Sequence, residues 1–224
     1  MAPLKIGSRG SPLAMRQAEE VRNALIANQP ELDVDIIEIS TTGDMIQDRT
    51  LAAIGGKGLF TKEIEQALLE RVIDISVHSA KDMLTEFPPG LILGPILQRE
   101  DTRDGFISRG RQMLSEMPEG SVIGTASLRR QAQILAMRPD LKVIPFRGNV
   151  QTRLRKLDEG QADATLLAVA GLKRLDRMDV LTQLFDPEMI LPAVGQGAIA
   201  IELRADDEKS LRAVEPLNHF KSAT

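Results

Sequence analysis

Short apolar runs alternate along this chain with longer segments in which apolar residues recur at every third or fourth position. The short runs predict β-strands at residues 4–6, 34–39, 73–77, 91–96, 122–124, 143–146, 164–170 and 199–203. The longer segments have the period of an amphipathic helix, and they cover residues 12–28, 61–72, 128–137 and 150–157. Strands that alternate with helices in this way predict an α/β protein.

Three of the predicted helices begin next to a short turn that carries arginine. Ser11, Ser127 and Asn149 are the predicted N-caps, whose side chains accept hydrogen bonds from free backbone N–H groups. The arginines near these helix starts are Arg9, Arg129, Arg130, Arg147 and Arg153. Because the positive end of a helix dipole repels cations, arginine at this place favours a bound carboxylate or phosphate. For any single one of them, a surface salt bridge is the alternative.

Polar side chains also gather where the strand at residues 73–77 ends. Within five residues the chain has His78, Ser79, Lys81 and Asp82, so Asp82 is expected on a loop at the carboxyl end of a strand. Ligands of open α/β sheets bind at that position, which makes Asp82 a candidate catalytic carboxylate. The alternative is a solvated aspartate paired with Lys81.

Two glycine-bearing segments resemble nucleotide-binding motifs, but neither has the required context. In residues 55–60, Lys57 is followed by Gly58 instead of Ser or Thr, which excludes a P-loop. The spacing Gly195-x-Gly197-x-x-Ala200 is followed by a strand pattern where a dinucleotide site needs a helix. The second segment is better explained as a crossover that returns the chain to its first sheet and leaves the Gln196 amide at a cleft.

The charged segment at residues 98–104 predicts a domain boundary. Together with the crossover it gives a discontinuous first domain, residues 1–97 with 198–217, and a second domain, residues 98–197. We expect two α/β lobes of mixed or parallel sheet with flanking helices, joined by two crossing segments around a hinged cleft. This arrangement resembles the type II periplasmic binding proteins.

Composition excludes several other classes. The net charge of −4 and only six aromatic residues, all Phe, argue against a nucleic-acid binder. The sequence has two histidines and no cysteine, so neither a metal site nor a disulfide is expected. No apolar run approaches membrane-spanning length, and the first residues lack the apolar core of a signal peptide, so we expect a cytoplasmic protein.

Six stretches of the chain together resemble the porphobilinogen deaminase (hydroxymethylbilane synthase) family. They are SRGSPLA at 8–14, GGKGLF at 55–60, VHSAKD at 77–82, GTASLRR at 124–130, RGNV at 147–150 and LPAVGQG at 191–197. The resemblance covers nearly the whole chain. It implies head-to-tail joining of porphobilinogen units, with loss of ammonia, into the linear tetrapyrrole hydroxymethylbilane. Each substrate carries an acetate and a propionate, which guanidinium groups bind bidentately.

The resemblance also implies roles for single residues. Asp82 would be the catalytic carboxylate, which stabilises the cationic azafulvene left when ammonia departs and transfers protons. The implied cofactor-binding residues are Asp44, Lys81, Thr125, Ser127, Arg129, Arg130, Arg147 and Gly148. The implied substrate-binding residues are Arg9, Ser11, Arg147, Arg153, Arg174 and Gln196. Residues 43–60 would form a mobile lid, with Lys57 and Phe60 approaching the site.

The chain departs from the family pattern in two respects. Family members carry a third domain with a cysteine that covalently holds a dipyrromethane cofactor, whereas this sequence has no cysteine and ends at Thr224. Residues 218–224 are therefore expected to be a stub leading to a missing domain. Ala80 stands where a bulkier apolar residue is usual, which would loosen the packing behind Asp82.

Two functional alternatives stay open beside the enzyme. The first is a catalytically inactive two-domain module that binds a polycarboxylated pyrrole. The second, a periplasmic solute receptor, is disfavoured by the absence of a signal peptide. In each case the expected partner is a small molecule, with no nucleic acid and no membrane, and the enzyme is expected to be a monomer.

Overall fold

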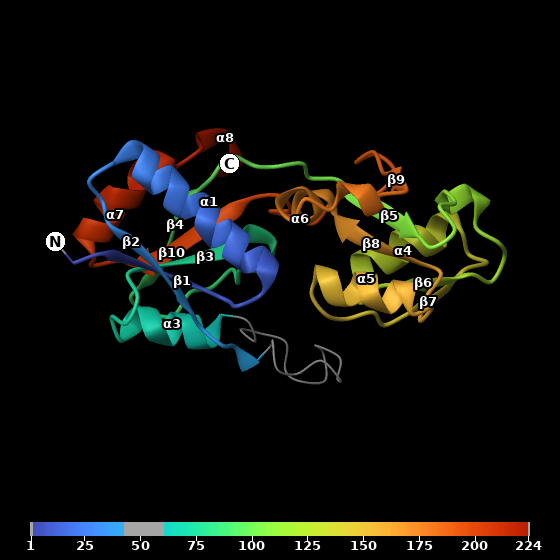
Figure 1. Ribbon diagram of the computed structural model, residues 1–224, viewed down its shortest axis with the longest axis horizontal. Helices are drawn as coiled ribbons and strands as arrows, with labels where there is room; N and C mark the ends of the chain where they lie inside the picture. The colour runs from blue at the N-terminus through green and yellow to red at the C-terminus, as the bar shows by residue number, and fades with distance from the viewer. Residues whose placement is uncertain (1, 43–60, 224) are drawn as a thin grey trace. The chain divides into compact units, whose positions relative to one another are not determined.

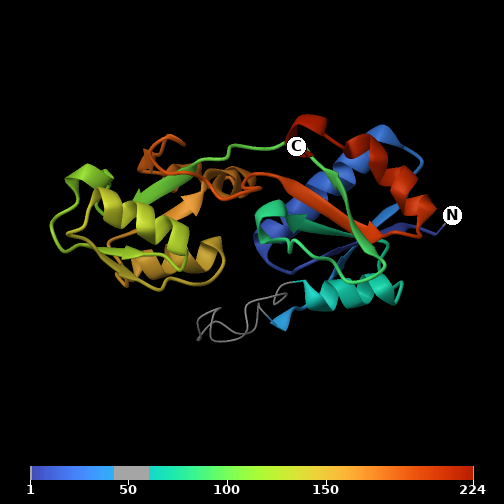
Figure 2. The same ribbon diagram turned by 180° about the vertical axis from the view of Figure 1, so that it is seen from behind.

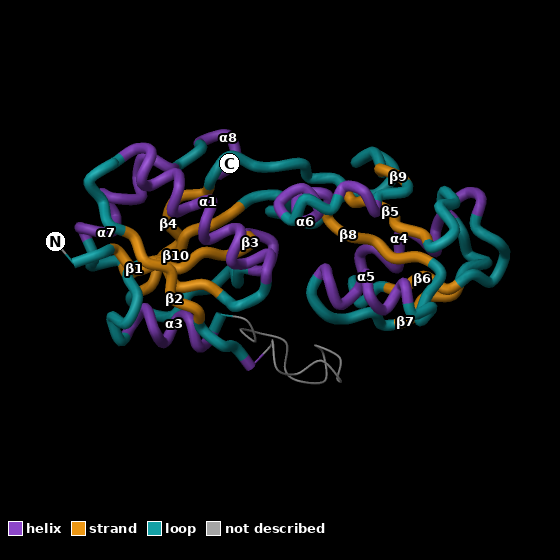
Figure 3. The backbone as a smooth tube through the Cα atoms, viewed as in Figure 1, coloured by secondary structure: helices purple, strands orange, loops and turns teal. Residues whose placement is uncertain are grey.

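A computed structural model of the chain describes residues 2–42 and 61–223. The chain divides into two compact units, which we call unit 1 (Met1–Glu100 with Gly197–Thr224) and unit 2 (Asp101–Gln196). Each unit has a five-stranded sheet with helices on both faces (Figure 3). The predicted α/β class with two mixed sheets is confirmed.

The sheet of unit 1 has the strand order β2-β1-β3-β10-β4. The strands are β1 (Leu4–Ser8), β2 (Val34–Glu38), β3 (Ile75–Ser79), β4 (Leu91–Ile96) and β10 (Ile199–Arg204). β1 pairs in parallel with β2 and β3, while β10 is antiparallel to β3 and β4. The carboxyl ends of the three parallel strands and the start of β10 therefore share one edge, the carboxyl edge of unit 1.

Helices cover both faces of this sheet (Figures 1 and 2). The elements are α1 (Pro12–Asn28), α3 (Lys62–Leu69), α7 (Glu208–Val214) and α8 (Phe220–Ala223), with 3-10 turns η2 (Ala80–Asp82) and η5 (Glu215–Leu217). α1 begins at its predicted cap, because the Ser11 side chain accepts a hydrogen bond from Ala14 N at 3.3 Å. α1 and α7 share one apolar core with β1, β3 and β10, and α3 packs in a second core with Ile73 and Leu91.

Arg204, at the end of β10, holds the carboxyl end of α3. Its Nη1 donates to Leu68 O at 2.6 Å and to Ile73 O at 2.7 Å, and its Nη2 pairs with Asp74 and Asp207. The last carbonyls of a helix have no partner within the helix, so a buried guanidinium that binds them stabilises this end.

The sheet of unit 2 has the order β7-β6-β8-β5-β9. The strands are β5 (Asp104–Ser108), β6 (Val122–Gly124), β7 (Lys142–Ile144), β8 (Ala164–Ala168) and β9 (Gln183–Leu184). β6 is parallel to β7 and β8, and β5 is antiparallel to β8 with Asp104 opposite Ala168. The first residue of β5 therefore lies at the carboxyl ends of the parallel strands, the carboxyl edge of unit 2.

Two cores hold the helices of unit 2 on its sheet. The elements are α4 (Leu128–Met137), α5 (Val150–Asp158) and α6 (Val169–Arg174), with 3-10 turns η3 (Leu114–Glu116) and η4 (Met178–Val180). α4 packs through Ile134 onto Phe106 and Phe185. α5 packs through Leu154 and Leu157 in the other core, which also contains Leu172 of α6.

Two predictions about this unit were wrong. Residues 164–170 were expected to form one strand, but β8 ends at Ala168 and α6 begins at Val169. The first four residues of α6 are all buried, and a continuous apolar run does not distinguish a strand from a buried helix. The segment 98–104 was expected to be only a charged crossing, whereas Asp104 begins the fully buried strand β5.

No helix among residues 2–42 and 61–223 is long and apolar enough to cross a membrane.

Candidate functional site

Asp82 lies where the sequence predicted it, at the end of the 3-10 turn that follows β3. Both Lys81 and Asp82 are exposed to solvent. The turn is held by its backbone, since Ala80 N donates to Ala198 O at 3.0 Å and Met83 N donates to Ala80 O at 3.2 Å. A rigid strand end thus presents the carboxylate to solvent at the carboxyl edge of unit 1.

Two further predicted residues share this edge. Arg9 directly follows β1 and is half-buried, and Ser11 caps α1. β1 and β3 are adjacent parallel strands, so the ends that carry Arg9 and Asp82 are neighbours in one sheet. The predicted residues Asp44, Lys57 and Phe60, and the predicted lid as a whole, lie outside the described residues.

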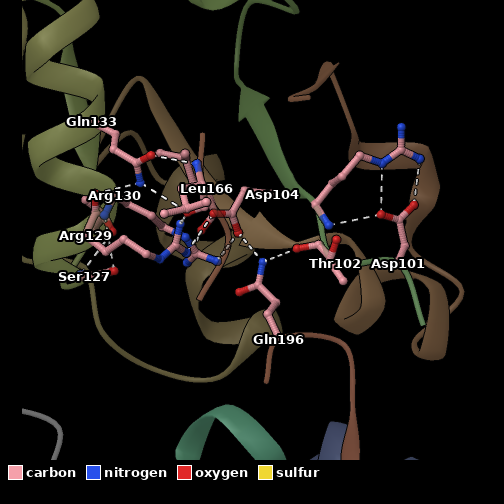
Figure 4. A network of polar contacts seen from close by, with 12 residues as sticks. Asp101, Thr102, Asp104, Ser127, Arg129, Arg130, Gln133, Leu166 and Gln196 are labelled. Carbon is pink, nitrogen blue, oxygen red and sulfur yellow. Dashed lines mark hydrogen bonds and ion pairs between the residues drawn. The ribbon is translucent and has the colours of Figure 1, made fainter. Parts of the chain in front are cut away.

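The carboxyl edge of unit 2 holds a buried polar network centred on Asp104 (Figure 4). The Asp104 carboxylate is fully buried, and Arg130 Nη2 donates to its Oδ1 at 2.7 Å. Arg129 Nη2 lies 2.7 Å from Oδ2, and the Gln196 amide donates to Oδ1 at 2.9 Å. Gln196 also donates to Thr102 O at 2.7 Å. Asp104 therefore joins the start of α4 to the segment that contains Gln196.

Two opposing effects act on the pKa of Asp104. Burial raises the pKa, because it disfavours the charged carboxylate. The charges and hydrogen bonds of Arg130 and Arg129 lower it and outweigh burial, so the pKa lies below its ordinary value. The sequence favoured a bound anion beside these two arginines, and the structure supplies the protein's own carboxylate at this place.

Arg129 and Arg130 differ in how far they are committed to the protein. Arg130 is buried, and its Nη1 donates to Leu166 O at 3.0 Å in addition to the contact with Asp104. Arg129 is one-quarter exposed and donates from Nη1 to Leu191 O at 2.5 Å. Of the two guanidinium groups, Arg129 is the one that an external anion can reach.

The turn after β7 presents a second cationic group at the same edge. Arg147 Nη1 is buried and has no hydrogen-bond partner among the described residues. The next residue, Gly148, has φ +118°, and a Cβ there would approach Thr152 to 2.5 Å, so this turn requires glycine. Arg153 Nε donates to Gly148 O at 2.8 Å and fixes the same turn from α5.

The smaller predicted residues of unit 2 support these turns. The Ser127 side chain accepts from Arg130 N at 3.4 Å and caps α4, while Ser127 N donates to the Thr125 hydroxyl at 3.2 Å. Arg174 lies in the last turn of α6, directly after the β8 end of the edge. The predicted residues of unit 2 thus gather at the ends of its three parallel strands.

Comparison with known proteins decides the family. A family model described as "Porphobilinogen deaminase, dipyromethane cofactor binding domain" matches residues 4–212. The chain belongs to the porphobilinogen deaminase family. The predicted resemblance is therefore confirmed. The chloroplastic porphobilinogen deaminase of Oryza sativa subsp. japonica is 56% identical over 220 residues, which cover 96% of this chain and 62% of that protein.

Solved structures of low sequence identity share the fold of this deaminase-family chain. The methionine-binding protein MetQ matches with a TM-score of 0.57 at 13% identity, over 96% of this chain and 89% of that one. The VFT2 domain of Bordetella pertussis BvgS has a TM-score of 0.53 at 15% identity, over 96% and 84%. A Salmonella typhimurium periplasmic binding protein has a TM-score of 0.52 at 11% identity, over 100% and 95%. The predicted fold, that of type II periplasmic binding proteins, is confirmed.

Sequence reasoning missed Asp104 in this deaminase-family chain. It stands in a run of charged residues, where a solvated side chain is the ordinary expectation. The available signal was the apolar run Phe106-Ile107 that follows, which marks the beginning of a buried strand. No group of three or more His, Cys, Asp or Glu residues that could hold a metal ion occurs in the described part of the chain, where none was expected.

The unit 2 edge of this family member fits the carboxylates of a dipyrromethane. Arg147 has a buried donor without a partner among the described residues, and the half-buried Arg129 lies close by in sequence order of the turns. A planar guanidinium binds a carboxylate bidentately. The covalent attachment does not fit, because the sequence has no cysteine to form a thioether.

Proposed function

We propose that this protein acts as a porphobilinogen deaminase, joining porphobilinogen units head to tail with loss of ammonia to give hydroxymethylbilane. It would serve the biosynthesis of tetrapyrroles such as haem. The chain spans 62% of the length of the rice relative, so the activity of the whole relative comes to this chain as a proposal.

The observation that carries the proposal is Arg147. A buried guanidinium nitrogen without a hydrogen bond is costly unless a ligand completes it, and the described protein offers none. Each porphobilinogen brings two carboxylates, and Arg9, Arg129 and Arg153 are further cations for a growing chain that accumulates them. Lys81, Ser127 and Arg174 would support these contacts, and Gly148 and Thr125 would shape the turns.

Asp82 would supply the chemistry. As an exposed carboxylate on a fixed turn, it can accept a hydrogen bond from the pyrrole N–H of the substrate. When ammonia departs, positive charge develops on the remaining azafulvene, and a preorganised carboxylate stabilises that charge. The same carboxylate can take up and return a proton. Bound dipyrromethane would supply the pyrrole terminus to which the first substrate unit is joined.

A second candidate is a module that binds a polycarboxylated pyrrole without converting it. The observation that favours it is the absence of cysteine from all 224 residues, which leaves no thioether anchor for dipyrromethane. Both candidates require the same carboxylate contacts, and they differ in ammonia release.

Substitution of Arg147 by Gln is expected to weaken the binding of porphobilinogen by roughly 10- to 100-fold, the value of one or two hydrogen bonds between charged groups. Isothermal titration calorimetry measures the affinity. The matched control is Arg155→Gln in the same α5, because Arg155 is exposed and pairs with Glu159 at 3.2 Å. Equal affinity of the Arg147 variant and the native chain would contradict both candidates.

We further propose that the protein is a monomer of the cytoplasm whose partner is this small molecule, and neither nucleic acid nor a membrane. The rice relative is named as chloroplastic, so fractionation of the native cells, with size-exclusion chromatography of the purified chain, tests this assignment.

A further inference from the structure

A second polar cluster lies inside unit 1, on the sheet face that α3 covers. Ser76 Oγ and His78 Nε2 of β3 are 2.8 Å apart, and His78 Nε2 is 3.1 Å from Glu202 Oε2 of β10. The Ser76 hydroxyl also lies 3.3 Å from the same Glu202 oxygen. All three side chains are buried, and Glu202 is fully so. The proposed chemistry uses none of them.

The stability of the fold does not account for Glu202. Among the described residues, no lysine or arginine pairs with its carboxylate, and Oε1 has no hydrogen-bond partner. On the opposite face of β10, Ile201 and Leu203 are fully buried in an apolar core. Burying a carboxylate costs free energy, and replacing a buried ionic group with an apolar one of similar size is often neutral or stabilising.

The cluster lies directly before the turn that carries Asp82. His78 is the last side chain that β3 directs to the α3 face. The next residue, Ser79, is held from the other face, where Gln17 Nε2 of α1 donates to its hydroxyl at 2.9 Å. Ala80 is then bonded to the start of β10. Successive residues therefore fix the end of β3 from both faces of the sheet.

We propose that Glu202, acting through His78, is a positioning residue for the Asp82 turn. Its carboxylate holds the imidazole, the imidazole holds the end of β3, and the strand end sets the place of the exposed Asp82 side chain. The inference rests on the proposed function in that it assigns the purpose of this rigidity to catalysis. A displacement of about 1 Å at a catalytic group can lower a rate roughly 100-fold.

The test separates the position of the turn from the stability of the fold. Glu202→Leu is expected to leave the free energy of unfolding unchanged or higher, to lower kcat about 10- to 100-fold, and to change KM less than about twofold. Glu202→Gln keeps the shape and one acceptor oxygen, so it is expected to restore most of kcat. Arg204→Met, in the same strand, is the matched control. It removes the contacts to α3 and is expected to lower stability while kcat stays within about twofold.

Amide hydrogen exchange without substrate gives a second readout, which does not depend on turnover. In Glu202→Leu the Ala80 amide is expected to exchange about tenfold faster or more. The reference is the Ile39 amide, which is bonded to Ser8 O at 2.8 Å at the same edge and is expected to be unchanged. Unchanged exchange at Ala80 would overturn the positioning role. If the native chain releases no ammonia, the proposed function fails for this chain, and the exchange at Ala80 still decides the positioning role.

Discussion

Substitution of Asp104 by Ala is expected to lower the free energy of unfolding of unit 2 by about 3–5 kcal/mol, the cost of breaking a buried ion pair. The loss is large because the variant leaves the buried Arg130 guanidinium without its counter-charge and removes an acceptor of Gln196. Urea denaturation at neutral pH measures it. The control is Asp179→Ala, since Asp179 is exposed and pairs with Arg177 at 3.1 Å. That variant is expected to lose less than about 1 kcal/mol. Losses of equal size in the two variants would contradict the buried network.

The same carboxylate gives the stability a pH dependence of known sign. In the folded protein the pKa of Asp104 lies below its ordinary value of 3.8. The folded state therefore binds the proton less readily than the unfolded state, and ionised Asp104 stabilises the fold above that ordinary value. This contribution is lost as the pH falls through the folded pKa. The Asp104→Asn variant is expected to lose less stability than the native chain on acidification below about pH 4, measured by urea denaturation at a series of pH values.

Substitution of Asp82 by Asn is expected to reduce ammonia release from porphobilinogen by roughly 100- to 10,000-fold, because the amide neither carries the negative charge nor transfers the proton. Affinity for porphobilinogen is expected to change little, since the arginines that hold its carboxylates are untouched. Because Asp82 is exposed, the variant is expected to be as stable as the native chain.

The control for Asp82 is Glu86→Gln, which removes another exposed carboxylate four residues further along the chain. This variant is expected to keep its activity. Equal rates for Asp82→Asn and the native chain would remove Asp82 from the catalytic role, and a parallel loss of affinity would assign it to binding instead.

The local features of the fold could be predicted because they depend on local chemistry. The helix at 128–137 has the observed bounds of α4, and the predicted caps Ser11, Ser127 and Asn149 all accept hydrogen bonds from their helices. The place of Asp82 could be predicted for the same reason. A strand pattern followed by polar residues marks the end of that strand wherever it lies in the fold.

The buried charges could not be predicted, because their burial comes from long-range pairing. Asp104 is covered only when β5 pairs with β8, sixty or so residues away along the chain. Glu202 and Arg204 stand in the polar positions of an alternating pattern, which ordinarily face solvent. In this sheet β10 is a central strand with helices on both faces, so all six of its residues are buried.

The most direct test of the proposed function is ammonia release from porphobilinogen by the purified chain, with the product identified and the intact mass of the protein recorded before and after. The account predicts release of ammonia, formation of a linear tetrapyrrole and loss of this activity in Asp82→Asn. Tight binding of porphobilinogen with no ammonia and an unchanged protein mass would contradict the enzyme and leave the binding module.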